Sequence, residues 1–202
     1  LTFARHDLPQ VAPGFVGVAP VPANLFLLPT ELHDRVGNHP CEENPQRQQI
    51  IPYIVLVNEQ NKVFCYSRGA AGAEDKLKAK LSIGLGGHVD NVPPSGTSLH
   101  AWVVEEARRE LEEEVGFTDT TAQLIFDGLI FDRTKDVENS KVYVGQVHVG
   151  LLSVVRCNSS AVGKLEAGII EDAGWCSTEY LTDVNERLEL WSQAALTHIL
   201  KR

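Results

Sequence analysis

Acidic residues crowd the segment from Glu105 to Glu114, and carboxylates at this density are the side chains best suited to chemistry in this chain. Each residue of an α-helix advances by about 100°, so several of these carboxylates should share one face. They are Glu106, Glu110, Glu113 and Glu114. Neighbouring like charges would destabilise the helix by about a few tenths of a kcal/mol per pair. A bound divalent cation such as Mg²⁺ would offset that repulsion; the alternative is an acidic face that is simply solvated.

The rest of this segment fits a helix packed on a core. An apolar stripe adjoins the acidic face, and a third side is left to water. The stripe consists of Val104, Ala107, Leu111 and Val115; the water-facing residues are Glu105, Arg108 and Glu112. Thr97 or Ser98 should cap the first turn, and Gly116 suits the left-handed position after the last turn.

The order of residues in this helix carries a family resemblance. Residues 109–117, Arg-Glu-Leu-x-Glu-Glu-x-Gly-Phe, resemble the second half of the Nudix box, G-x5-E-x7-R-E-U-x-E-E-x-G-U, in which U is a bulky apolar residue. Residues 86–90, Gly-Gly-His-Val-Asp, resemble the glycine-rich turn that opens the box. Residues 174–181 resemble the W-x-S-x-x-E-L segment that often closes the fold. The chain is identified as a member of the Nudix (MutT-like) superfamily, similar to a group loosely described as predicted phosphoesterases.

The resemblance implies roles for particular residues. Glu110, Glu113 and Glu114 match carboxylates that bind Mg²⁺ or Mn²⁺, and Glu110 also matches a residue that serves as general base in some members. Arg109 matches the arginine that orients this carboxylate. A backbone carbonyl of Gly86 or Gly87 could add a metal ligand. A further acid comes from a later loop in many members, and Glu166 is better placed for it than Glu171.

The first half of the box departs from the family pattern. Counting back from Arg109, the expected glutamate falls on Ala101 and the expected glycine on Ser95, so the loop from 90 to 98 carries an insertion. Asp90, Glu105 and Glu106 are the replacements to consider, and Glu106 has the best helical phase. The predicted catalytic set is therefore Glu106, Arg109 and Glu110.

The implied activity is metal-dependent hydrolysis of a phosphoanhydride in a nucleoside diphosphate linked to another group. Ala101 motivates an alternative, a Nudix module that binds a ligand or regulates with little or no turnover. Diphosphate isomerases share the fold, but no cysteine is placed to support that chemistry. The sequence lacks a G-x-S-x-G element and a Cys–His arrangement, so water is the expected nucleophile.

Charge and composition restrict the partners. A formal net charge of −9 opposes binding of a nucleic acid polymer, which needs a basic surface. No apolar run approaches the roughly 18 residues of a membrane span, and no signal pattern opens the chain. The four cysteines are scattered and indicate reduced thiols, hence a cytoplasmic protein; a homodimer is left open.

His88 could donate to phosphate, assist a base or be structural. The basic residues before the glycine turn are expected in a solvated loop or beside phosphate; they are Arg68, Lys76, Lys78 and Lys80.

The chain divides into two parts. Residues 1–48 are rich in proline and predict an irregular N-terminal extension packing on the domain, with a short helix near 29–36. Residues 49–202 form the expected Nudix domain: a hairpin at 53–66, strands over 81–83, 124–131, 142–155 and 173–176, and a terminal helix within 186–200. This pattern fits an α/β/α sandwich around a mixed sheet.

Overall fold

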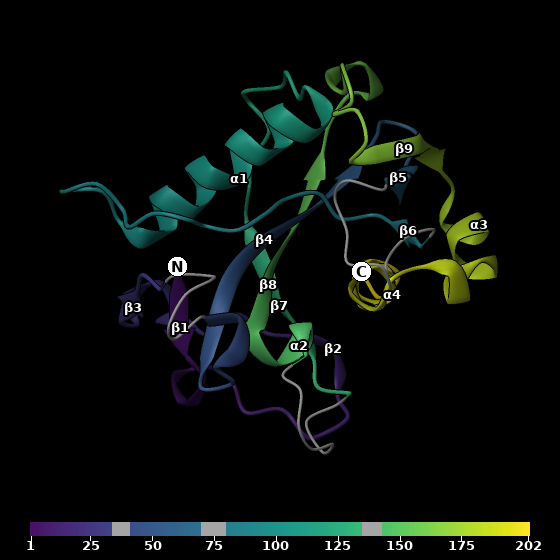
Figure 1. Ribbon diagram of the computed structural model, residues 1–202. Coiled ribbons are helices and arrows are strands. Elements are labelled where there is room, and N and C mark those ends of the chain that lie inside the picture. Colours follow the sequence, from purple (N-terminus) through teal and green to yellow (C-terminus); the bar gives the residue numbers. More distant parts are fainter. Residues whose placement is uncertain (34–40, 70–79, 135–142) are drawn as a thin grey trace.

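The computed structural model describes residues 1–33, 41–69, 80–134 and 143–202. In these ranges the strands join in one mixed sheet (Figure 1). The strands are β1 (Thr2–Ala4), β2 (Val16–Ala19), β3 (Thr30–Glu31), β4 (Arg47–Val57), β5 (Val63–Arg68), β6 (Leu81–Ser82), β7 (Phe126–Asp132), β8 (His148–Arg156) and β9 (Ile170–Cys176). The longest path runs β2-β7-β8-β4-β1-β3, and β5 joins β4 to β6 and β9.

The parallel pair β4 and β8 is the centre of the sheet. The two strands are in register from the pair Gln49 and His148 to the pair Val57 and Arg156. Nearly every residue of both strands is buried, as expected of strands covered on two faces. This explains why their sequences are continuous apolar runs rather than alternating patterns.

Helices cover the two faces of the sheet. They are α1 (Leu99–Val115), α2 (Val144–Val147), α3 (Thr178–Asp183) and α4 (Leu190–Ile199), joined by the 3₁₀ turns η1 (Arg5–Asp7), η2 (Leu25–Leu27), η3 (Cys41–Glu43), η4 (Ser159–Ala161) and η5 (Asn185–Arg187). Leu111 of α1 packs in a core with Ile50 and Leu151, and Ala195 of α4 packs in a second core with Val55. Figure 1 shows α1 and α4 on opposite sides of β4 and β8. The expected α/β/α sandwich with a mixed sheet is confirmed.

The ends of α1 follow the predicted capping chemistry. The side chain of Ser98 accepts a hydrogen bond from the backbone N–H of Ala101 at 3.2 Å, which satisfies one of the free donors of the first turn. Gly116 ends the helix with φ of +56°, and its N–H donates to Glu112. Leu99 and Val103 are buried in the core and Val104 only partly, so the core stripe begins at Leu99, in the first turn, rather than at Val104.

Residues 1–48 contain more regular structure than their proline content predicts. β1 pairs with β4, and β2 pairs with β7. Both strands extend the sheet, and they satisfy backbone hydrogen-bonding groups of β4 and β7 that would otherwise be left unpaired. Residues 30–31 form a strand where a short helix was predicted, and residues 34–36 lie outside the described ranges. The expected boundary after residue 48 falls inside β4.

Other elements match their predictions with local differences. The hairpin consists of β4 and β5. The segment predicted as strand from 142 begins instead with the single turn α2, which is closed by hydrogen bonds between Tyr143 and Gln146. In the closing segment, Ser177 caps α3, Trp175 packs on Phe64, and Leu181 is fully buried. Ser177, Trp175 and Leu181 of this segment therefore stabilise the fold through a helix cap and core packing.

A buried carboxylate, Glu189, ties α4 to the sheet. It accepts hydrogen bonds from Arg68 Nε at 2.9 Å, from Ser82 at 2.8 Å and from Tyr53 at 3.1 Å. The side chain of Glu189 is 5% exposed, so its charge depends on Arg68 for compensation. A buried charge left without its partner costs far more than an exposed one.

Replacing Arg68 with Met should lower the free energy of unfolding by about 3 kcal/mol, because Glu189 would remain as an uncompensated buried charge. Adding Glu189→Gln to this variant should recover part of the loss. Urea denaturation of wild type, single and double variants measures both effects. A double variant less stable than the single one would contradict the assigned role of the pair.

Candidate active site

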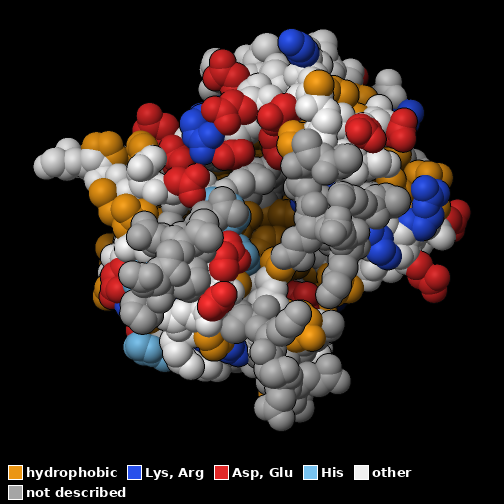
Figure 2. All heavy atoms as spheres, in the orientation of Figure 1, with side chains coloured by type: hydrophobic (Ala, Val, Ile, Leu, Met, Phe, Trp, Pro, Cys, Tyr) orange, Lys and Arg blue, Asp and Glu red, His pale blue; other side chains and the backbone are white. Residues whose placement is uncertain are grey.

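Arg109 lies at the centre of the acidic face of α1. Its guanidinium donates to Glu110 at 2.6 Å, to Glu113 at 2.7 Å and to Glu106 at 3.2 Å. Burial by itself would lower the pKa of Arg109, but Glu106 and Glu110 raise it overall. Figure 2 shows acidic side chains gathered around a basic one over α1. One cation therefore neutralises part of a charge cluster that would otherwise repel itself.

Glu114 joins α1 to the glycine-rich loop. One of its carboxylate oxygens accepts a hydrogen bond of 2.8 Å from the N–H of Gly86, and Glu114 is 8% exposed. Burial raises its pKa to about 7 although the Gly86 N–H favours the charged form, and the charge of Glu110 adds to the rise. Near neutral pH this carboxylate can therefore hold or release a proton.

Gly87 lets the backbone approach the Glu110 carboxylate closely. A Cβ atom at Gly87 would lie 2.7 Å from the Glu110 carboxylate, closer than van der Waals contact allows. Burial raises the pKa of Glu110, and Arg109 opposes that rise. Gly86 has φ of +129°, a conformation suited to glycine, and a Cβ there would lie 2.2 Å from the carbonyl oxygen of Pro52. The loop is thus in direct contact with two carboxylates of α1.

The proposed replacements for the missing glutamate differ in burial. Glu106 is 6% exposed and bound to Arg109, whereas Glu105 and Asp90 are exposed. Ala101, at the expected position of the family glutamate, is exposed in the first turn of α1. Glu106 is therefore the replacement that lies beside the rest of the cluster.

Glu166 also lies near this cluster. Its backbone N–H donates to the carbonyl of Glu114 at 2.8 Å, and its negative charge contributes to the raised pKa of Glu114. Glu171 lies in β9, with a carboxylate oxygen close to Gly69. Of the two acids considered for the later loop, Glu166 is the one that contacts α1.

The basic residues before the glycine turn have other partners. Arg68 is paired with Glu189, and Lys80 donates to the carbonyl of Glu186 at 2.8 Å. Lys76 and Lys78 lie outside the described residues. In the described part of the chain, these two cations are therefore engaged in the structure.

His88 contacts a second histidine, His148. Its Nε2 lies 3.0 Å from Nε2 of His148, and Glu42 lies nearby. Among the described residues, Glu42, His88 and His148 are the group of three donors whose ligand atoms all lie within 4.8 Å of one another. In the part of the chain that the structure describes, the carboxylates of α1 do not form such a group of three. Sequence reasoning missed Glu42 and His148, since three distant segments supply the group and no spacing signals it.

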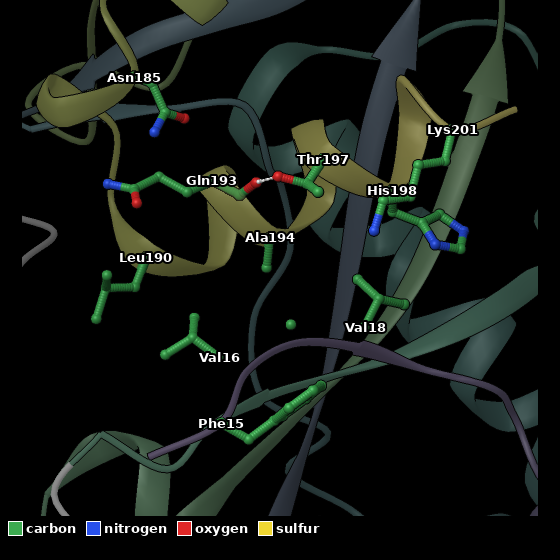
Figure 3. A pocket seen from close by; sticks show the side chains of 11 residues that line it. Phe15, Val16, Val18, Asn185, Leu190, Gln193, Ala194, Thr197, His198 and Lys201 are labelled. Carbon is green, nitrogen blue, oxygen red and sulfur yellow. Dashed lines mark hydrogen bonds between the residues drawn. The ribbon is translucent and has the colours of Figure 1, made fainter.

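A pocket of about 450 Å³ lies elsewhere, between β2 and α4. Figure 3 shows Phe15, Val16 and Val18 on one side and Gln193, Thr197 and His198 on the other. None of the carboxylates of α1 lines it. We therefore place the candidate active site at α1 and the glycine loop, where perturbed carboxylates meet, and not at this pocket.

Comparison with known proteins agrees with this view of the fold. The chain is 38% identical to the protein YmaB of Bacillus subtilis over 157 residues, which cover 76% of this chain and 71% of YmaB. It resembles the crystal structure of Tm1382, described as a candidate Nudix hydrolase, with a TM-score of 0.65 and 23% identity over 93% of this chain and 90% of that one. The MutT protein of Methanosarcina mazei Go1 matches 76% of this chain and 94% of its own with 17% identity and a TM-score of 0.47. No model of a protein family matches. In the described ranges, no helix has the length and apolar character of a membrane span.

Glu114→Gln should change how stability depends on pH in metal-free buffer. The pKa of Glu114 rises from 4.5 to about 7 on folding, so the folded wild type binds this proton more tightly than the unfolded chain. Wild type therefore loses up to about 3 kcal/mol of stability as pH increases through this window. Glutamine keeps an acceptor for Gly86 and carries no charge, so the variant should avoid this loss.

Denaturation at pH 4.5 and pH 8 in the presence of a chelator measures the difference between Glu114→Gln and wild type. The difference should shift in favour of the variant at pH 8. Added Mn²⁺ should stabilise wild type more than the variant. A difference that does not change with pH would contradict a buried, titrating Glu114.

Proposed function

We propose that this chain, which belongs to the same family as B. subtilis YmaB and has the fold of a Nudix hydrolase, is a metal-dependent pyrophosphohydrolase of the cytoplasm. Its substrate is a nucleoside diphosphate linked to another group, and water cleaves a phosphoanhydride bond of that substrate. The observation that carries the proposal is the contact of two α1 carboxylates, the buried Glu114 and the partly buried Glu110, with Gly86 and Gly87.

The donor set of this cluster fits Mg²⁺ or Mn²⁺. Both ions prefer oxygen ligands, and Glu110, Glu113 and Glu114 supply carboxylates, with the carbonyl of Gly87 and the loop residue Glu166 nearby. Burial raises the pKa of Glu110 and of Glu114, which means that each carboxylate lacks sufficient positive charge around it. Glu113 is 55% exposed at its side chain and can turn from Arg109 to an ion at small cost. When bound, the ion supplies positive charge to the phosphates and makes water more acidic.

The side chains around this position have distinct tasks. Arg109 holds Glu110 at 2.6 Å and fixes its rotamer, so that Glu110 can accept a proton from the attacking water. The pKa of Glu114 is about 7 in the metal-free protein, so binding of an ion near neutral pH would release the proton that Glu114 holds. Gly86 and Gly87 leave room beside these carboxylates for a phosphate to approach. Glu106 accepts a hydrogen bond from Arg109 at 3.2 Å and acts as a positioning residue.

A second candidate is a ligand-binding module with little turnover, and Ala101 is the observation that favours it. Such a module would bind the same diphosphate compounds and leave them intact. The carboxylates that accompany Arg109 favour hydrolysis, because simple binding of an anion gains nothing from buried negative charge.

Incubation with Mg²⁺ or Mn²⁺ and a panel of nucleotides, sugar nucleotides and dinucleotides tests the proposal. Wild type should release phosphate-containing products, and hydrolysis in ¹⁸O-water under single-turnover conditions should place the label in one of them. The double variant Glu113→Gln, Glu114→Gln should be at least about a hundredfold slower, since the ion contributes several kcal/mol. The exposed Glu112→Gln is the matched control and should be unaffected. Binding without products would favour the ligand-binding module, and a trapped phosphoryl-enzyme would refute attack by water.

Glu106→Gln should reduce turnover by about tenfold or more, because Arg109 would lose one of the carboxylates that orient it. Glu105→Gln changes the same residue type one position away, on the exposed side, and should stay within about twofold of wild type. Steady-state kinetics on the same substrate compares the two variants. Equal, small effects would show that the site operates without a substitute for the family glutamate.

A further inference from the structure

A second cluster with metal-ligand chemistry includes His88. It combines two imidazoles and one carboxylate: His88 from the glycine loop, His148 from the first position of β8, and Glu42 from η3. His148 is buried, while Glu42 and His88 are partly exposed. Figure 2 shows histidine and acidic side chains together at the rim of a hollow in this face. We propose that Glu42, His88 and His148 form a binding site for a Zn²⁺-class transition-metal ion, separate from the carboxylates of α1.

The hydrogen bonding of His148 determines which tautomer its ring adopts. Nδ1 of His148 lies 2.8 Å from the carbonyl oxygen of Val144. A carbonyl oxygen only accepts, so Nδ1 carries the proton, and the neutral ring presents a lone pair at Nε2. Ligand histidines usually donate their second N–H to a carbonyl or carboxylate in this way.

The turn that orients His148 is itself held firmly. Arg133 is buried and donates to the carbonyl of Gly145 at 2.9 Å and to Gln48 at 3.0 Å. Gln48 in turn donates to the carbonyl of Gln146. α2 is thus fixed to β4 by side chains, and the ring of His148 has a set direction before any ion binds.

The spacing of the donor atoms fits one ion. Nε2 of His88 and Nε2 of His148 are 3.0 Å apart. Two nitrogens that bind an ion at about 2.1 Å lie about 3.0 Å apart at a right angle and about 3.4 Å apart at a tetrahedral angle. Oε1 of Glu42 lies 3.9 Å from Nε2 of His148, which is about 0.5 Å more than the tetrahedral spacing of this pair. All three donor atoms lie within 4.8 Å of one another.

The donor types select the ion. Imidazole suits Zn²⁺ and its neighbours among the transition metals, whereas Mg²⁺ prefers oxygen. Two histidines and one glutamate leave a coordination position open, as in sites where zinc binds water or an anion. In the metal-free protein, His88 donates its Nε2 proton to His148; on binding, that proton moves to Nδ1 of His88 and both Nε2 atoms face the ion.

Equilibrium binding of Zn²⁺ tests this site apart from the proposed hydrolysis. Competition with a chromogenic chelator near pH 7.5 should show that His88→Asn, His148→Asn binds Zn²⁺ at least about a hundredfold more weakly than wild type. Glu42→Gln, at a partly exposed position, should weaken binding by about tenfold. The Glu113→Gln, Glu114→Gln variant leaves all three proposed ligands in place and should keep its Zn²⁺ affinity within about threefold. His6→Asn, at an exposed histidine, is the matched control and should bind like wild type.

Circular dichroism in chelator checks that each variant is folded, and Glu42→Gln keeps the test valid if the double histidine variant does not fold. Unchanged Zn²⁺ affinity in Glu42→Gln and in the histidine variant would overturn the site and leave a structural hydrogen bond between the two rings. Loss of Zn²⁺ binding in Glu113→Gln, Glu114→Gln alone would assign the ion to α1 instead. Activity is not measured, so failure of this site and failure of the proposed hydrolysis are distinguishable.

Discussion

The hydrogen bond from the Gly86 N–H to Glu114 is the contact on which the candidate active site depends. It joins a helix that covers one face of the sheet to a loop that runs beside β4, where Leu85 pairs with Ile54. A buried carboxylate without such a donor would be strongly disfavoured in its charged form. The donor lowers that cost but does not remove it, because the pKa of Glu114 stays at about 7. The loop therefore holds the carboxylate in place and leaves it able to exchange a proton or to accept an ion.

The glycine loop connects two chemically different clusters. Gly87 contacts Glu110, and the next residue, His88, contacts His148. At Gly87 the lack of a side chain lets the backbone lie close to the Glu110 carboxylate. At the next position the loop supplies the imidazole of His88, which is a metal-ligand type of side chain. The carboxylates of α1 and the cluster of Glu42, His88 and His148 therefore both contact the same loop.

The sequence predicted well what depends on local geometry. The phase of α1, its cap at Ser98 and its end at Gly116 follow from residues within one or two turns, and the helical period placed Glu106 beside Arg109. It predicted poorly what depends on distant partners. The strands near the N-terminus exist because β4 and β7 offer free edges, and Glu42 and His148 meet His88 only after the sheet forms. Contacts between residues so far apart in the chain produce no periodic pattern in a single sequence.

Arg109 explains why the acidic face can exist before an ion is bound. Three carboxylates share its guanidinium, so repulsion along α1 is compensated from within the helix. The compensation is uneven, however. Glu113 is mostly exposed and its pair with Arg109 is worth little in water, whereas Glu110 is more buried and remains short of positive charge. An entering cation would therefore draw Glu113 away at small cost and satisfy Glu110 and Glu114 at a large gain. Arg109 keeps its hold on Glu106 and Glu110 in that exchange, which leaves the oriented carboxylate in position.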